Sequence, residues 1–312
     1  MKRYLKFLTA TALALFTLVL TACNKIPLST NGYFWFEDAT SFPNGYEETL
    51  TYDVSVSHVT PSNSTEIKLD GYTLNVTEGV YTTTLKTITG ANNRYEYVTE
   101  LKLKGSYVTP EETKEFSDTF KTTSEFSKDL SPIKSEKEYS SELSGYAYKY
   151  KIDYQGSTAN CTLTEFVGTD NEATISFSFD KYNEGAFVDN DLMLLYGRLF
   201  NFNSSFSQPF KTIDVLSRKT HEMTYRAGIS GENLDVKSLD NYVINGAQPT
   251  EPKVNCVRVG ISINDTFSGN SIEAYYATDH QTHRHRLVET YTHITGNIGY
   301  LKFTLKSASV ND

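Results

Sequence analysis

The chain has 312 residues and a formal net charge of −9, and its acidic and basic residues are scattered without a basic cluster. Such a chain is not expected to bind nucleic acid or anionic lipid headgroups, because both attract clustered Lys and Arg side chains. Its 22 Tyr and 18 Phe, set against three Met and one Trp, favour pleated, half-buried strands over helices.

The first residues have the pattern of a secretory signal. Three basic residues precede an apolar run that is too short to span a bilayer, namely Lys2, Arg3, Lys6 and the run 7–20. The next motif, Leu20-Thr21-Ala22-Cys23, resembles the bacterial lipobox, in which the thiol is diacylated before cleavage. We expect residues 1–22 to be removed as a signal peptide and the mature chain to begin at a lipidated Cys23. An ordinary secreted protein and a signal anchor are the alternatives.

A lipidated Cys23 would place the protein outside the cytoplasm, anchored to the cell membrane. Each buried methylene contributes about 0.8 kcal/mol, so two acyl chains such as palmitate give stable attachment where one does not. Residues 23–42 are predicted to be the lipidated residue and a tether. The tether contains the aromatic patch Tyr33-Phe34-Trp35-Phe36, which is expected to dock on the domain that follows or to touch the membrane interface.

From residue 43 to residue 308 the chain reads as one β domain. Apolar and polar residues alternate most clearly over 50–56, 146–154, 175–179, 257–263 and 301–305. One apolar and one polar face per strand is typical of antiparallel sheet, and turn signals such as Asp70-Gly71 and Gly156-Ser157 recur at hairpin spacing. No linker rich in Pro or Gly divides this segment, which favours a single domain.

Two segments depart from the alternation. Asp189-Asn190-Asp191 provides a helix N-cap before apolar residues at three- and four-residue spacing, so a short helix is predicted over 191–200. A helix this apolar has to be covered on most sides, which predicts that it lies on a concave sheet. Residues 109–144 fit neither period well, and we predict strands with long polar loops there.

Cys161 and Cys256 are the two thiols that remain once Cys23 carries lipid. In an exported chain they can form a disulfide. That bond would close a loop of about 95 residues and contribute about 4 kcal/mol by the chain-entropy relation. The alternative is two free thiols that are buried in strands as small apolar side chains. The sequence leaves both open.

A histidine cluster is the strongest metal signal in the sequence. His280, His283 and His285 fall within six residues, and on a strand the last two would share a face suited to zinc. The segment is polar, however, and lies where a hairpin turn is expected, and Arg284 and Arg286 would repel a cation. We therefore expect neither a metal nor a cofactor.

Catalytic motifs are also weak. Gly228-Ile229-Ser230-Gly231 lacks the spacing of a nucleophile elbow, and the chain has no phosphate-binding glycine loop and no zinc-protease motif. Asp189 and Asp191 are better explained by helix capping than by acid–base catalysis. The sequence predicts a protein that is not an enzyme.

Several stretches resemble one family. The segments concerned are Phe42–Val54, Ile272–Ala277, Arg286–Thr290 and Gly299–Lys306. They are similar to the opening strand and the closing three-strand meander of exported bacterial half-barrel proteins of the lipoprotein-localisation-factor (LolA/LppX-like) superfamily, many of unknown function. The resemblance implies a mainly β fold, in which a large curved antiparallel sheet, a half-barrel, has one short helix covering its concave face. In relatives that face suits acyl chains.

The resemblance and the composition together favour a membrane-anchored surface lipoprotein that is not an enzyme and binds or carries a hydrophobic ligand such as lipid. A cavity left under an incomplete cover would be the binding site. Its predicted walls combine two strands and the helix: Tyr146, Tyr148, Tyr150, Phe177, Phe179, Leu195 and Leu199. The alternative is a structural or adhesive surface protein that has a packed sheet and acts through its loops, with an envelope protein as partner.

Overall fold

A computed structural model describes residues 45–61, 64–67, 71–88, 94–127, 131–142, 145–167, 171–200, 202, 205–228, 234–250, 252–264, 271–279, 282–294 and 298–311. The signal peptide, Cys23 and the tether of the sequence analysis lie outside these residues. Among the described residues, no helix has both the length and the apolar character needed to cross a bilayer.

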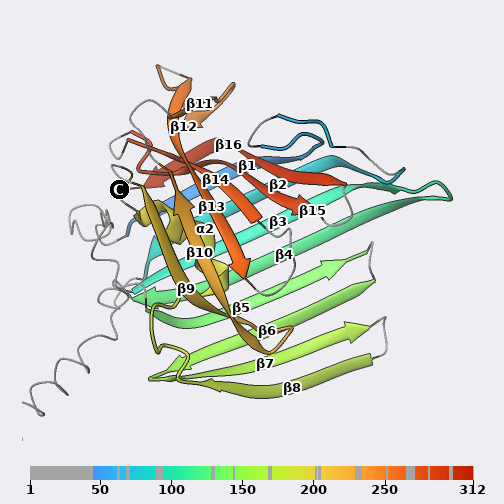
Figure 1. Ribbon diagram of the computed structural model, residues 1–312, viewed down its shortest axis with the longest axis vertical. Helices are drawn as coiled ribbons and strands as arrows, with labels where there is room; N and C mark the ends of the chain where they lie inside the picture. The colour runs from blue at the N-terminus through green and yellow to red at the C-terminus, as the bar shows by residue number, and fades with distance from the viewer. Residues whose placement is uncertain are drawn as a thin grey trace, which may run out of the picture.

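One open sheet of sixteen strands makes up the fold (Figure 1). The strands are β1 Glu47–Ser57, β2 Thr73–Thr87, β3 Arg94–Val108, β4 Thr113–Ser127, β5 Pro132–Ser141, β6 Tyr146–Gln155, β7 Thr158–Val167, β8 Asn171–Asp180, β9 Phe206–Asp214, β10 Lys219–Ala227, β11 Asp235–Ser238, β12 Val243–Ile244, β13 Lys253–Asn264, β14 Ser271–Ala277, β15 Leu287–Ile294 and β16 Gly299–Asn311. This confirms the predicted mainly β, antiparallel, curved sheet.

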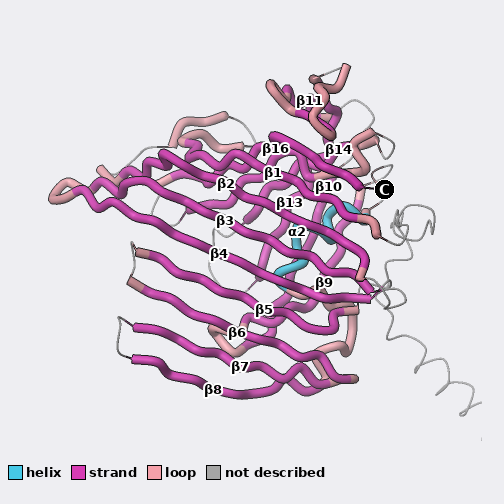
Figure 2. The backbone as a smooth tube through the Cα atoms, turned by 180° about the vertical axis from the view of Figure 1, so that it is seen from behind, coloured by secondary structure: helices cyan, strands magenta, loops and turns pink. Residues whose placement is uncertain are grey.

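The order of the strands explains the shape. It runs β8-β7-β6-β5-β4-β3-β2-β1-β16-β15-β14-β13-β10-β9, so two antiparallel meanders join where β1 pairs with β16. The short β12 pairs in parallel with β16, and β11 pairs with β13. A twisted sheet of this width curls. Figures 1 and 2 show β9, β10 and β13 crossing over the inner side of the first meander.

The predicted helix is present between β8 and β9. It consists of the 3-10 turn η1 (Asn190–Leu192), the α-helix α2 (Met193–Tyr196) and the 3-10 turn η2 (Gly197–Leu199). Asp189 is the N-cap, and its Oδ1 accepts a hydrogen bond of 2.8 Å from the Asp191 backbone N–H. The segment contacts β4, β9 and β14, so it lies inside the curve of the sheet and covers the concave face (Figure 2).

The helix lies very close to β14. A Cβ atom added at Gly197 would come within 2.0 Å of the Tyr276 hydroxyl oxygen, so only glycine fits there without a shift. The same tyrosine hydroxyl donates a 2.9 Å hydrogen bond to the Leu194 carbonyl. The contact of the Tyr276 hydroxyl with the helix backbone, and not helix propensity, therefore fixes the helix on this strand.

One prediction needs correction, and the structure favours one of two alternatives for the thiols. Residues 109–144 form the strands β4 and β5, as predicted, but their connections are short and not long polar loops. Cys161 and Cys256 are free thiols that are buried in different hydrophobic clusters. The structure therefore agrees with the alternative of two buried free thiols and not with a disulfide. Burial raises the pKa of each thiol to about 12, which keeps both protonated and unreactive.

The hydrophobic core of the described residues consists of two clusters. The larger cluster joins β1–β4, the helical segment, β9, β10 and β13–β16, whereas the smaller one joins β6 and β7 with Tyr182, Phe187, Ile213 and Val215. The second meander therefore covers most of the first. Its cover becomes thinner toward β8.

The buried carboxylate of Glu48 connects β1 with the helical segment and with the turn before β15. Glu48 on β1, 1% exposed, accepts a 2.6 Å hydrogen bond from Arg198 Nη1 on η2 and a 2.8 Å hydrogen bond from Arg286 Nε at the start of β15. Arg198 and Arg286 also donate to the carbonyls of Arg284 and Thr282. Burial alone would raise the pKa of Glu48, but the two guanidinium groups lower it to about 2.

The Glu48→Gln variant tests this clamp. Removing the charge leaves two buried guanidinium groups without a carboxylate, which should cost about 3–5 kcal/mol of unfolding free energy at pH 7. Asp53→Asn is the control because Asp53 forms an exposed ion pair with Lys306 and should cost less than about 1 kcal/mol. Urea denaturation followed by circular dichroism measures both. Equal small losses would contradict the assigned role of Glu48.

Candidate functional site

Five half-buried or buried rings line the inner face of β5, β6 and β8. We define this inner aromatic strip as Tyr139, Tyr146, Tyr148, Phe177 and Phe179. Tyr139 lies opposite Tyr148 in the β5–β6 pairing, with ring centroids 5.1 Å apart, and Tyr146 lies 5.7 Å from Tyr148. Phe177 and Phe179 contact edge to face at 5.6 Å. Four of the predicted ligand residues thus share one face of the sheet.

The rings of the strip on β5 and β6 and those on β8 pack against one buried cluster that runs across β7. Cys161 pairs with Ile152 on one side and with Phe177 on the other, and it is 2% exposed. The strip itself is less covered, since only Tyr148 among its five members is buried. Arg218, in the β9–β10 turn, lies over the Phe177 ring at 5.6 Å. The turn therefore covers one part of the strip and leaves the rest accessible.

Hydroxyl groups give the strip a polar component. Tyr146 donates a 2.5 Å hydrogen bond to Glu165 on β7. Burial and this hydrogen bond raise the pKa of Tyr146 to about 12. Tyr150, the neighbour of the strip on β6, donates a 2.8 Å hydrogen bond to Asp191. A ligand on this surface would meet aromatic faces with fixed hydroxyl groups at their edge.

Leu195 and Leu199 do not belong to this surface. They are 1% and 0% exposed and pack in the larger hydrophobic cluster. They lie apart from the inner aromatic strip, and Tyr150, which is 7% exposed, is also in the packed interior. The helix fills the concave face beneath it and leaves the open part of the inner face to β5–β8.

A buried polar cluster lies where the helix begins. Asp189 accepts a 2.7 Å hydrogen bond from the Ser135 hydroxyl and a short one from the Tyr154 hydroxyl. Asp191 forms an ion pair with Lys137 on β5, and both side chains are almost fully buried. Sequence reasoning missed Ser135 and Lys137, because the 109–144 region gave no clear pattern that would orient its side chains.

This cluster changes the acidity of Asp189. Burial, together with the nearby Asp191 carboxylate, raises the pKa of Asp189 to about 6, although hydrogen bonds from Tyr154, Ser135 and the Asp191 backbone act in the opposite direction. Raised carboxyl pKa values occur at catalytic sites. Here the carboxyl is 1% exposed and capped on all sides by the fold, so it has no route to a substrate.

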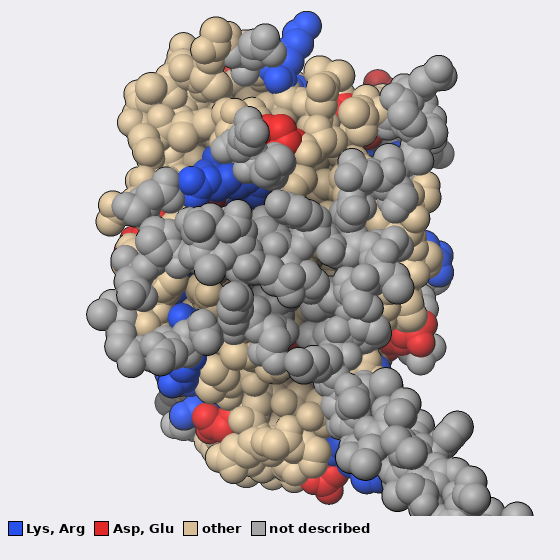
Figure 3. Space-filling model, turned by 90° about the vertical axis from the view of Figure 1, so that its left-hand side faces the viewer, with Lys and Arg blue, Asp and Glu red and all other residues tan. Residues whose placement is uncertain are grey.

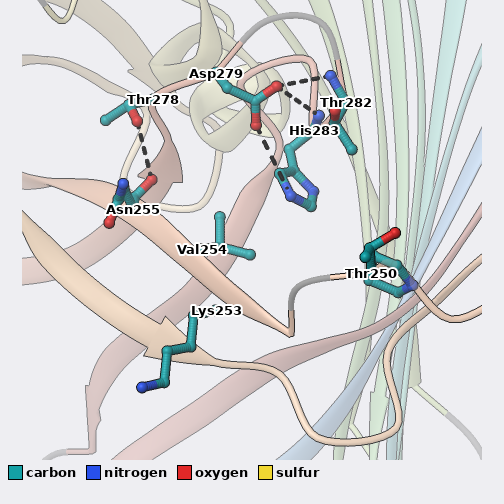
Figure 4. A pocket seen from close by; sticks show the side chains of 9 residues that line it. Thr250, Lys253, Val254, Asn255, Thr278, Asp279, Thr282 and His283 are labelled. Atoms are coloured by element: carbon teal, nitrogen blue, oxygen red, sulfur yellow. Dashed lines mark hydrogen bonds and ion pairs between the residues drawn. The ribbon is translucent and has the colours of Figure 1, made fainter.

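A polar pocket of about 380 Å³ opens beside the turn between β14 and β15 (Figure 4). It is lined by Pro249, Thr250, Lys253, Val254, Asn255, Thr278, Asp279, Thr282 and His283. Asp279 Oδ1 accepts backbone hydrogen bonds from Thr282 at 2.7 Å and His283 at 3.2 Å. The carboxylate thus shapes the turn, as the polar sequence of this segment predicts.

The histidines of this turn serve packing. His283 Nε2 lies 3.8 Å from Asp279 Oδ2, and burial lowers the pKa of His283, an effect that Arg286 reinforces and Asp279 opposes. His285 packs edge to face on Phe202 with a centroid distance of 5.2 Å. Within the described residues, no three of the His, Cys, Asp and Glu side chains come together as metal ligands. His280 lies outside those residues.

A shallow groove of about 430 Å³ crosses the outer face of β3–β7. Its side chains come mostly from outward strand positions, among them Lys121, Glu138, Lys149 and Phe166. The 2.9 Å ion pair of Glu138 and Lys149 bridges β5 and β6 beside it. Tyr139 and Tyr148, two members of the inner aromatic strip, also line the groove, so it adjoins the strip where β5 pairs with β6.

Figure 3 shows the charged side chains of one face of the described residues. There the Lys and Arg side chains and the Asp and Glu side chains lie in small separate groups among uncharged residues. A surface that steers a highly charged partner would carry one extended sign of charge.

Comparisons with known proteins support the fold and leave the site to be argued from the geometry. No family model matches the chain, and no curated protein matches it. The chain is similar to a beta-barrel-like protein of the domain of unknown function DUF1849 from Brucella abortus, with a TM-score of 0.50 and 9% identity over 86% of this chain and 100% of that one.

A weaker likeness joins the chain to a protein of Bacteroides fragilis that has a YmcC-like fold and is named as a candidate exported protein. The TM-score is 0.27, with 7% identity over 87% of this chain and 98% of that one. This score is too low to relate the two folds. At these identities the comparisons concern fold alone, and the first of them agrees with a large curved antiparallel sheet.

The raised pKa of Asp189 has a consequence for stability. The folded state binds a proton up to about pH 6, whereas an unfolded Asp releases it near its ordinary pKa of 3.8. The stabilising contribution is therefore complete below about pH 4 and is lost as the pH rises through 6, a change of about 3 kcal/mol.

Asp189→Asn should remove this dependence. Asparagine keeps the N-cap but does not titrate, so the slope of unfolding free energy against pH between 4 and 6 should flatten by about 3 kcal/mol in total. Asp53→Asn, at an exposed position, is the matched control. Denaturant unfolding at half-unit pH steps measures the slopes. A wild-type slope that persists in Asp189→Asn would refute the assignment.

Proposed function

We propose that this protein is an exported, lipid-anchored surface protein that is not an enzyme and binds a hydrophobic ligand, such as a lipid, on the inner aromatic strip. The single observation that carries the proposal is the incomplete cover of the strip. Tyr139 and Tyr146 are half-buried beside buried inward neighbours on β5 and β6, and all of Ile175, Phe177 and Phe179 on β8 are half-buried. An accessible row of rings on a concave face is the kind of surface that apolar ligands occupy.

The anchoring part of the proposal comes from the sequence. Leu20-Thr21-Ala22-Cys23 follows a basic and apolar leader, and a diacylated Cys23 would hold the mature chain on the membrane. The described residues begin at Gly45, about twenty residues after Cys23. Burial of Cys161 and Cys256 would protect both thiols from the oxidants that an exported chain meets.

The non-enzymatic part is supported by how the reactive groups are used. Three buried carboxylates form hydrogen bonds or ion pairs within the fold, namely those of Asp189, Asp191 and Glu48. His283 lies in a turn that Asp279 holds closed. The hydroxyl oxygen of Ser217 lies 3.2 Å from Nε2 of His221, but the Asp214 carboxylate faces that same nitrogen at 3.6 Å. A catalytic triad needs the carboxylate on Nδ1, the other ring nitrogen, so this group does not have the arrangement that acyl transfer requires.

The packed concave face also supports a second candidate function. Because the helical segment packs Leu195 and Leu199 against the sheet, the ligand cannot be enclosed as it would be in an empty half-barrel. A structural or adhesive surface protein that acts through its loops would need no such cavity. The two candidates differ in what the inner aromatic strip binds.

Membrane partitioning tests the anchor. In Cys23→Ala, the thiol that would carry the acyl chains is absent, so the protein should leave the membrane fraction or remain unprocessed. Cys161→Ala is the matched control, because that thiol is buried in the domain. Cell fractionation and intact mass analysis measure the result. Unchanged partitioning of Cys23→Ala would overturn the lipoprotein proposal.

Native mass spectrometry of the mature protein, released from a mild detergent, tests the ligand. We expect a noncovalent mass of lipid size beyond the covalent anchor, and its loss on denaturation. Phe177→Ser should reduce its occupancy at least fivefold, because a polar side chain replaces a ring of the strip. Tyr72→Ser is the control, as Tyr72 is 41% exposed outside the strip. A protein that stays unliganded after incubation with envelope lipids would favour the adhesive candidate.

A further inference from the structure

The two edges of the open sheet are protected very differently. At the β9 edge, Lys211 N–H donates a 2.7 Å hydrogen bond to the Ala186 carbonyl, and Val188 N–H donates a 2.9 Å hydrogen bond to the Lys211 carbonyl. Pro209, within β9, has no N–H to offer another strand. A covering segment and a proline are both devices that block edge pairing.

The β8 edge has no such protection in the described part of the chain. β8 is the last strand of the sheet and pairs on one side only, with β7 (Figure 1). Between residues 173 and 179 it carries no charged residue, no proline and no bulge. A long, regular and uncharged edge presents free N–H and C=O groups that can pair with another strand.

Charge also disappears from the outer face toward this edge. Ion pairs link β2 to β3 and β5 to β6, as in Lys86–Glu96 at 2.7 Å and Lys149–Glu138 at 2.9 Å. On β7 and β8 the exposed outward residues from 160 to 178 are Thr, Ser and Asn instead, namely Asn160, Thr162, Thr174, Ser176 and Ser178, and an exposed charge returns only at Asp180. The central part of β8 thus carries no charge of its own that would repel a second copy, and the nearest cation on the inner face is Arg218 over the Phe177 ring.

The sequence of β8 is complementary to itself in one antiparallel register. With Phe177 placed opposite Phe177 of a second copy, Ile175 lies opposite Phe179 and Ser176 opposite Ser178. Apolar residues then share the inner face and hydroxyl residues share the outer face. Thr174 lies opposite Asp180, so no like charges are opposed over this span.

We propose that the β8 edge is a homodimer interface, in which β8 of one copy pairs antiparallel with β8 of a second copy about a two-fold axis at Phe177. The pairing satisfies the open backbone groups of both edges and is isologous, as in most closed dimers. It also joins the inner aromatic strips of the two copies through Phe177 and Ile175. The inference goes beyond the proposed ligand binding and does not depend on it.

Disulfide trapping in native membranes tests the register. In Phe177→Cys, the two introduced thiols face each other with Cβ atoms about 4.5–5.5 Å apart, close enough for a bond after small shifts. Mild oxidation should trap at least half of the protein as dimer on a non-reducing gel. Thr174→Cys is the matched control. In this register, residue 174 of one copy and residue 174 of the other are six residues apart along the strand, or about 20 Å. The native thiols are buried, so the wild type should stay monomeric on the gel.

A charge swap tests the same register without relying on one ring. Adding Ser176→Lys to Phe177→Cys should lower trapping at least fivefold, because a lysine blocks edge pairing. Adding Ser178→Glu as well should restore it, since residue 178 of one copy faces residue 176 of the other. Thr162→Lys, equally exposed on β7, should have little effect.

The outcomes decide the proposal. Trapping by Phe177→Cys, but not by Thr174→Cys, together with rescue by the charge pair, supports the two-fold register. Equal trapping of both cysteines indicates random collision, and no trapping indicates a monomer, so either result overturns it. Should Phe177→Cys fail to accumulate, the exposed pair Ser176→Cys and Ser178→Cys gives the same test. Wild-type protein that stays unliganded, together with intact trapping of Phe177→Cys, would count against the proposed function only.

Discussion

The fold depends on one buried carboxylate. Glu48 belongs to the first strand, Arg198 to the helical segment and Arg286 to the turn before β15, so their contact joins residues from the beginning, middle and end of the domain. The desolvation cost of three buried charges is repaid only when all of them are in place, with the carbonyls of Thr282 and Arg284 accepting further hydrogen bonds. The clamp therefore selects one arrangement of the layers.

The helical segment needs this clamp because it has little stability of its own. Ten residues with 3-10 geometry at both ends cannot stay helical alone in water. Its start is held by Asp189 and by the Asp191–Lys137 ion pair, and its end is held by Arg198. Between these polar contacts, Leu195 and Leu199 bury their side chains against the sheet. The chain can therefore cross from β8 to β9 through the interior and cover the concave face.

The same crossing gives the molecule a packed half and an accessible half. The helix and the second meander cover β1–β4, whereas the inner face of β5–β8 carries half-buried rings. Ion pairs on the outer face of this side end at β5 and β6, as in Lys149–Glu138. Among the described residues, nothing protects the edge of β8 in the way that Pro209 and the 186–188 segment protect β9. Ligand contact and association of copies are thus both proposed for one region of the sheet, for the same physical reason: incomplete cover.

Local patterns in the sequence determined the strands, the antiparallel sheet and the Asp189 cap, because alternation and capping depend on neighbouring residues. They also indicated the inner face of β6 and β8. Only the tertiary structure decided which rings stay accessible, that Leu195 and Leu199 are core, and that Cys161 and Cys256 lie apart as free thiols. Partners such as Glu48 with Arg198 and Arg286, or Asp189 with Ser135, are separated by 54 to 238 positions, and no local period encodes such a meeting. The curl of the sheet and the chain crossing bring them together.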